Sequence, residues 1–160
     1  MTDPGDLENN PILQRLRAAD PEAVSQILTF RGEITVVVPA GHLRRVAELL
    51  QAEPGLEFSF LSDISAVDRF PLEPRFELNY QLLSIPLRQI LCLRVTVPGG
   101  QNPQVETVTP VWPAADWLER EIFDLFGVRF LGHPDLRRIM MPDNWEGHPL
   151  RKDYPVEGFR

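Results

Sequence analysis

Two histidines near the end of the chain have the residue types and neighbours of a metal site. His133 and His148 each stand in a Gly-His-Pro tripeptide, and Asp135 and Asp143 lie nearby. Two imidazoles and a carboxylate are a common ligand set for zinc. However, zinc-binding histidine pairs usually lie about three to five residues apart on one element, whereas these two lie fifteen residues apart. We therefore expect both rings to hydrogen-bond to backbone or carboxylate groups and to stabilise turns before proline.

The segment EREIFD places several charged groups on one predicted helix. Glu121 and Asp124 are three residues apart and share a face, Arg120 can pair with Asp124, and Glu119 adds a third carboxylate. Paired carboxylates can carry out acid–base chemistry, but no serine, cysteine or lysine nucleophile accompanies them. The pattern therefore favours a solvated or partner-facing helix surface.

Basic and aromatic side chains recur in the proline-rich stretch that follows this helix. Arginine and aromatic residues are enriched at the energetic centres of protein interfaces. Phosphate binding is the competing interpretation, but the chain has no glycine-rich strand-to-helix loop and no Walker or dinucleotide motif. We therefore predict contacts with a partner protein. The residues concerned are Arg137, Arg138, Trp145, Arg151, Lys152 and Tyr154.

Composition limits the classes of protein to which the chain can belong. With 160 residues, 43% of them hydrophobic, it can form one domain with an ordinary core. Its net charge of -7 argues against a nucleic-acid partner, which would require a basic face. The single cysteine, Cys92, excludes an internal disulfide and a cysteine-ligated cluster. Because no long apolar run is present and the start is acidic, we expect a cytoplasmic chain with no direct membrane span.

Hydrophobic periodicity predicts the elements that position these groups. The patterns indicate an α+β fold with a mostly antiparallel sheet of about four strands and flanking helices. The short link between the last two predicted strands favours an antiparallel pair. Gly127 is expected to end the last helix. The predicted helices span residues 10–30 (one or two), 41–55 and 113–126, and the predicted strands span 33–39, 56–68, 75–83 and 89–97.

The sequence changes character after Gly127, where four prolines recur at intervals of six to eight residues. Such spacing leaves no room for a helix or central strand of normal length. We therefore predict a globular domain at 1–127 and an extended, irregular C-terminal arm at 128–160. The arm is rich in large apolar residues, Phe159 among them, that so short an irregular segment cannot bury against itself. They must contact this domain or another protein.

Four motifs in this order resemble the signature of one family, the thirty-kilodalton or C subunit of NADH:quinone oxidoreductase, which is respiratory complex I. They are ERE at 119–121, FDLFG at 123–127, GHPDLRRI at 132–139 and MPDNWEGHPLRKDYP at 141–155. The upstream segments GEITVVVP and PVWPAADWLERE are also similar to that family, so the resemblance covers nearly the whole chain.

The resemblance implies a peripheral subunit of a membrane-bound complex that passes electrons from NADH through FMN and Fe-S clusters to quinone, coupled to proton translocation. It implies no catalytic centre and no cofactor in this chain, a position on the cytoplasmic face of the membrane, and packing beside the forty-nine-kilodalton quinone-site subunit and the cluster-bearing subunits. The expected partner interface comprises Glu119, Arg120, Glu121, Asp124, His133, Arg137, Arg138, Trp145, His148, Arg151, Lys152, Asp153 and Tyr154.

Two alternatives remain at this stage. Related chains serve ferredoxin-dependent photosynthetic complexes and membrane-bound hydrogenases, where the same structural role is expected with a different electron donor. A stand-alone metal-dependent enzyme that uses His133, His148 and the acidic helix is the alternative from another class of protein.

Overall fold

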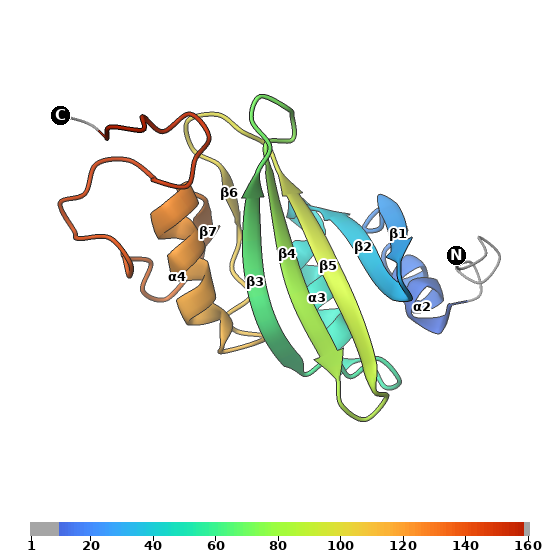
Figure 1. Cartoon of the computed structure of the whole chain (residues 1–160). Coiled ribbons are helices and arrows are strands. Elements are labelled where there is room, and N and C mark those ends of the chain that lie inside the picture. Colours follow the sequence, from blue (N-terminus) through green and yellow to red (C-terminus); the bar gives the residue numbers. More distant parts are fainter. Residues whose placement is uncertain (1–9, 159–160) are drawn as a thin grey trace.

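The computed structural model describes residues 10–158, so the polar start of the chain and Phe159 lie outside the description (Figure 1). The helices and strands lie between residues 11 and 131. In order they are α2 (Pro11–Ala19), β1 (Gln26–Phe30), β2 (Glu33–Pro39), the 3-10 turn η1 (Ala40–His42), α3 (Leu43–Ala52), β3 (Phe60–Asp68), β4 (Phe76–Ser84), β5 (Gln89–Val97), β6 (Gln104–Glu106), α4 (Ala115–Phe126) and β7 (Arg129–Leu131).

The main sheet has five strands in the order β1-β2-β5-β4-β3. All neighbours pair antiparallel except β2 and β5, which are parallel. The predicted α+β class, mostly antiparallel sheet and antiparallel β4–β5 pair are therefore confirmed. The prediction of helix up to residue 30 is wrong at its end, because Gln26–Phe30 is a strand. Arg31 and Gly32 both have positive φ, which is typical of a tight hairpin turn, and this turn pairs β1 with β2.

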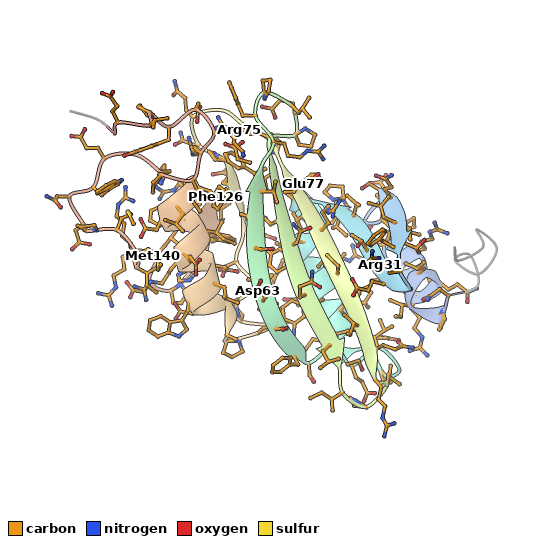
Figure 2. All side chains as sticks on the ribbon, in the orientation of Figure 1. Arg31, Asp63, Arg75, Glu77, Phe126 and Met140 are labelled. Atoms are coloured by element: carbon orange, nitrogen blue, oxygen red, sulfur yellow. The ribbon has the colours of Figure 1, made fainter. Side chains whose placement is uncertain are left out.

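The core lies between the sheet and α3, which covers one sheet face (Figure 1). Alternate residues of β4 are buried, as a half-covered strand requires. The α3 residues toward the sheet follow the predicted helical spacing and include Leu43, Val46 and Leu50, which are at most 1% exposed. The opposite sheet face carries Glu77 and other polar groups (Figure 2).

The strand predicted at 56–68 begins later than expected. Leu56 and Phe58 are fully buried, but they precede β3, which starts at Phe60. Between them Glu57 has a φ of 46°. A non-glycine residue in this left-handed conformation is incompatible with an extended strand, so the apolar alternation there reflects burial of an irregular link.

Helix α4 packs beside β3, and the C-terminal arm passes around the outer side of the helix (Figure 1). The helix ends before Gly127, as predicted. The short strand β7 pairs parallel with β6 and was not expected. Within 132–158 the described chain forms turns and irregular structure without a further helix or strand. The division into a domain at 1–127 and an arm at 128–160 stays a prediction.

Candidate functional site

Asp124 anchors the arm to α4 from a fully buried position. Its Oδ2 accepts hydrogen bonds from the backbone N–H groups of Ile139, Met140 and Met141 at 3.0, 2.7 and 2.8 Å. Its Oδ1 accepts from the Arg138 guanidinium at 2.5 Å. Burial opposes ionisation of Asp124, but the bonds from the Met141 N–H and the Arg138 guanidinium outweigh it and lower its pKa. One carboxylate thus gathers three successive arm amides onto the helix.

Arg75 makes the second anchor, where the loop after β3 meets the arm (Figure 2). Its guanidinium donates to both carboxylate oxygens of Asp68 at 2.8 and 2.7 Å and to both of Asp153 at 2.9 and 2.6 Å. Asp68 also accepts from the Lys152 N–H at 2.8 Å. Burial opposes ionisation of Asp68, but the Arg75 guanidinium outweighs it, and the pKa of Asp68 falls to about 2. Bidentate pairs of this kind fix the orientation of both partners.

Sequence reasoning missed Asp68 and Arg75. They flank the loop RFPLEP, and the residue that completes the anchor, Asp153, lies 78 positions after Arg75. No local spacing rule relates side chains at that separation. The one available signal is an acidic residue, Asp68, at the end of a strand that otherwise contributes to a buried face.

Glu119 forms a third buried site at the centre of α4, with 0% of its surface exposed. Its carboxylate accepts from the Val108 N–H at 2.8 Å and lies 2.5 Å from the Thr107 hydroxyl. Burial is the dominant influence and raises the pKa of Glu119 to about 7, despite these two hydrogen bonds. Glu119 therefore links α4 to the segment that follows β6.

The prediction of a solvated surface for EREIFD is wrong for Glu119, Arg120 and Asp124, which are buried within the chain. Arg120 does not pair with Asp124 but donates to the backbone carbonyls of Arg137 and Arg138, at 3.3 Å each. Glu121 is exposed, as predicted. The reason for the difference is that the arm folds over this side of α4 and supplies partners that helical periodicity cannot reveal.

Both histidines connect the arm to backbone carbonyls of α4. His133 accepts from the Asp135 N–H at 3.1 Å through Nδ1, and its Nε2 lies 3.2 Å from the Asp116 carbonyl oxygen. The Nδ1 of His148 lies 2.9 Å from the Asp124 carbonyl oxygen. Both rings bond to backbone groups, as predicted, but only His133 bonds within its own turn, whereas His148 bonds to α4. Across residues 10–158, no group of three or more His, Cys, Asp or Glu side chains is arranged to hold a metal ion.

The basic residues of the arm fall into two groups. Arg138 and Arg151 are directed inward: beyond its pair with Asp124, Arg138 donates to the Trp145 and Gly147 carbonyls at 3.0 and 2.9 Å, and Arg151 donates to the Phe126 carbonyl at 2.5 Å. Both guanidinium groups thus have hydrogen-bond acceptors within the chain. Arg137 and Lys152 are exposed.

The remaining predicted contact residues lie on the outer part of the arm. Trp145 is exposed, and the half-buried Tyr154 donates through its hydroxyl to the Glu146 carbonyl at 3.3 Å. The side chain of Asp153 is 44% exposed although it pairs with Arg75. The prediction that the thirteen residues named above form a partner interface stays a prediction.

Gly127 ends α4 in a left-handed conformation with φ 72°, and its position is tightly enclosed. An added Cβ would overlap the ring of His148 and the guanidinium of Arg151. We expect Gly127→Ala to lower the free energy of unfolding by about 2 kcal/mol, from backbone strain and displacement of the arm. Urea denaturation followed by circular dichroism measures this loss.

The matched control for Gly127 is Gly100→Ala. Gly100 also has a left-handed φ, 101°, but an added Cβ would meet nothing within 4 Å. This control carries the backbone strain alone. Equal losses in the two variants would show that contact with the arm contributes nothing at Gly127.

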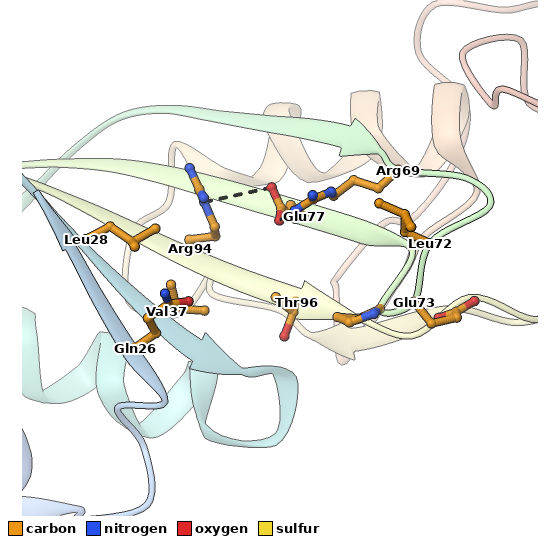
Figure 3. Close-up of a pocket in the computed structure, with 10 residues that line it drawn as sticks. Gln26, Leu28, Val37, Arg69, Leu72, Glu73, Glu77, Arg94 and Thr96 are labelled. Atoms are coloured by element: carbon orange, nitrogen blue, oxygen red, sulfur yellow. Dashed lines mark hydrogen bonds and ion pairs between the residues drawn. The ribbon is translucent and has the colours of Figure 1, made fainter. Parts of the chain in front are cut away.

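The uncovered sheet face holds a pocket of about 390 Å³ between β1, β5 and the loop after β3 (Figure 3). Glu77 lies in it between two arginines: it pairs with Arg69, and Arg94 Nε is 3.9 Å from its carboxylate. Arg94 also donates to Asn79 at 2.9 Å. The acidic group is thus already neutralised, and the lining residues include no serine, cysteine or histidine that could act as a nucleophile or base.

The chain resembles known proteins over most of its length. A chain from Roseiflexus sp. (strain RS-1), named as the C subunit of NADH-quinone oxidoreductase, is 47% identical over 150 residues, which cover 94% of this chain and 86% of the relative. The protein of that name from Geotalea uraniireducens is 43% identical over 151 residues, covering 94% and 90%.

A solved structure is also similar. It is titled as the membrane-bound sulfane sulfur reductase, an archaeal respiratory membrane complex, and one of its chains superposes with a TM-score of 0.76 at 26% identity, covering 96% of this chain and 87% of that one. In the part of the present chain that is described, no helix has the length and apolar character to cross a bilayer. Residues 36–160 match the family model described as respiratory-chain NADH dehydrogenase, 30 Kd subunit. The resemblance found in the motifs is therefore confirmed, and the chain belongs to the family of the 30 Kd subunit of respiratory-chain NADH dehydrogenase.

Proposed function

We propose that this chain is a non-redox assembly subunit of the peripheral arm of proton-translocating NADH:quinone oxidoreductase, complex I. In this proposal it packs beside the quinone-site subunit on the cytoplasmic face of the membrane. FMN, Fe-S clusters and quinone are then bound by partner subunits, through which electrons pass from NADH. Family membership and the names of the relatives support this assignment.

The single observation that carries the docking role is that the arm directs charged side chains inward and leaves large apolar side chains exposed. Its arginines Arg138 and Arg151 donate to Asp124 and Phe126 of α4, inside the chain, whereas large apolar side chains of the arm are exposed. Met140, which Figure 2 marks beside α4, is 57% exposed. Because the arm backbone is already held in place, little ordering entropy is lost when a partner covers these side chains. The exposed set is Met140, Trp145, Leu150 and Val156.

The cysteine content supports the non-redox part of the proposal. The chain has one cysteine, Cys92, which lies in β5. Burial raises the pKa of its thiol, which disfavours the thiolate that a metal would bind. Iron–sulfur clusters ordinarily require about four protein ligands. A cluster in this chain would therefore lack its usual ligand set.

A second candidate is the same structural role in a complex with another electron donor. The similarity to a chain of the sulfane sulfur reductase complex favours this alternative, but the higher identity to subunits named for NADH and quinone favours complex I. Mass spectrometry of the co-purifying subunits separates the two, because a flavin-containing NADH-oxidising subunit is expected only for complex I. The stand-alone enzyme finds no support in the histidines, since each ring is hydrogen-bonded to a backbone carbonyl of α4.

Surface substitutions test the docking role directly. We expect Met140→Ser, Trp145→Ser and Leu150→Ser together to reduce co-purification of the other subunits of the complex at least about tenfold, because apolar anchors dominate interface energy. The unfolding free energy should change by less than about 1 kcal/mol, since exposed side chains contribute little to the core. Affinity purification followed by quantitative mass spectrometry measures the first effect and urea denaturation the second.

The matched control changes exposed apolar residues far from the arm. Ile85 and Ile90, at the β4–β5 hairpin, are 61% and 58% exposed. Their replacement by serine should leave co-purification intact. Normal assembly of the arm variant would contradict the docking role. Deleting 128–160 is a poorer test, because it would also remove the partners of the buried Asp68 and Asp124.

A further inference from the structure

A buried polar cluster lies where α4, the segment after β6, strand β4 and the start of the arm meet. The side chains of Glu119 and His133 are both 0% exposed, and His133 Nε2 is 3.9 Å from Glu119 Oε2. The hydroxyl of Tyr80 and Oδ1 of Asp116 are buried without a hydrogen-bond partner in the described part of the chain, and the Asp116 oxygen lies 3.6 Å from His133 Nε2. The exposed apolar residues proposed for docking, Met140, Trp145, Leu150 and Val156, do not belong to this cluster.

The negative charge of an ionised Glu119 would be stabilised by fewer and weaker donors than the charges of the buried Asp124 and Asp68. Asp124 and Asp68 each receive an arginine at hydrogen-bond distance. Glu119 receives one backbone N–H, from Val108, and a neutral hydroxyl. An ionised carboxylate in such surroundings is costly because two neutral donors do not replace its hydration shell. The neutral acid suits the site, since it can donate its proton to the Thr107 hydroxyl 2.5 Å away.

The charged and titratable groups around Glu119 come from every element packed against it. Asp116 precedes it by one turn of α4 and repels the ionised form, while Arg44 of α3 attracts it from a distance. Tyr80 of β4 also faces it, since the charge of Glu119 raises the pKa of the tyrosine, after the larger influence of burial. His133 faces it from the arm. Of these, His133 is a potential donor that an ionised Glu119 could recruit by a small movement.

We propose that Glu119 is a proton-operated latch at the junction of the arm with α4. As the neutral acid it leaves His133 bound to the Asp116 carbonyl, 3.2 Å from Nε2, and the junction is closed. When Glu119 loses its proton to solvent, the carboxylate draws the Nε2–H of His133 toward itself. The turn at 132–134 then shifts along α4. This inference concerns the isolated chain and does not depend on the docking role.

The burial of Glu119 determines whether the stability of the chain rises or falls with pH. Burial raises its pKa from 4.5 to about 7, so the folded chain holds a proton that the unfolded chain releases. The resulting stabilisation is complete below about pH 4.5 and is lost as the pH rises through about 7. The latch would therefore open within the neutral range.

Carbon-13 NMR of the complete, unsubstituted chain tests the latch without any variant. We expect the Glu119 carboxyl carbon to titrate with a midpoint near 7, and the His133 ring and the Val108 amide to shift with the same midpoint. A midpoint below about 5.5, one unit above an ordinary glutamate, would overturn the proposal. So would a Glu119 titration to which the His133 ring does not respond.

Two variants test whether ionisation of Glu119 causes the change in the NMR signal of the His133 ring. Glu119→Gln keeps the size of the side chain and cannot ionise, so the His133 shift at neutral pH should disappear. Glu121→Gln changes an exposed glutamate on the same helix and should leave that shift unchanged. If the His133 shift persisted in Glu119→Gln, another group would be its cause and the latch would be refuted. If this variant failed to fold, the titration of the unsubstituted chain would still decide the matter.

Discussion

Replacing Asp124 with alanine is expected to release the arm from α4 and to lower the free energy of unfolding by about 3–5 kcal/mol. The carboxylate is fully buried, and its loss leaves the half-buried Arg138 guanidinium without its ion pair. It also removes the acceptor for three consecutive backbone N–H groups, 139–141. Urea denaturation measures the stability, and hydrogen exchange of these three amides measures release of the arm.

Two controls make the Asp124 experiment specific. Asp124→Asn retains an acceptor oxygen but loses the charge that Arg138 needs, so its loss should be intermediate. Glu121→Ala removes an exposed carboxylate from the same helix, and a change within about 0.5 kcal/mol is expected. If the amides at 139–141 stayed protected in Asp124→Ala, the arm would be held by other contacts, and Asp124 would not be its anchor.

Replacing Arg75 with methionine is expected to cost about 3–5 kcal/mol as well, because it leaves a buried carboxylate unpaired. The guanidinium is the shared partner of Asp68, which is 4% exposed, and of Asp153 in the arm. Methionine keeps most of the apolar stem while removing every donor. Differential scanning calorimetry should show a lower transition temperature, and proteolysis should cut the arm near residue 153 more rapidly.

The matched control for Arg75 is Arg69→Met. Arg69 belongs to the same loop, but its side chain is 45% exposed and pairs with Glu77 at the surface. Exposed pairs are worth up to about 1 kcal/mol. The double variant Asp68→Asn with Arg75→Met should recover part of the loss, because no buried charge remains unpaired. A cost for Arg75→Met no larger than that for Arg69→Met would show that the buried pair is not an anchor.

The ion pair between Asp68 and Arg75 also predicts how the stability of the chain decreases at low pH. The pKa of Asp68 is lowered from 3.8 to about 2 in the folded chain. A lowered carboxyl pKa stabilises the fold above about 3.8, and this contribution is lost as the pH falls toward about 2. In Arg75→Met the pKa of Asp68 should rise, so that this variant loses less stability on acidification than the unsubstituted chain.

Local patterns predicted the elements whose residues contact one another over short separations. Helix α4 and its end at Gly127 follow from apolar spacing and a glycine in the left-handed conformation. The β4–β5 pair follows from period-two alternation and a short link. In contrast, β1 resembles the end of a helix in sequence, and it is a strand because it pairs with β2. Pairing energy of this kind is absent from any local window.

The sequence by itself determined the α+β class, the family motifs and the lack of a helix or strand in the described residues 132–158, because periodicity, proline spacing and motif order are properties of neighbouring residues. Only the tertiary structure decided which charges are buried. The fold brings together three charged residues from distant parts of the chain, Asp68, Arg75 and Asp153. Other segments cover α4 and thereby bury Asp124 and Glu119. Burial and ion pairing depend on which residues surround a side chain in the folded chain. Local sequence patterns do not show which distant residues these are.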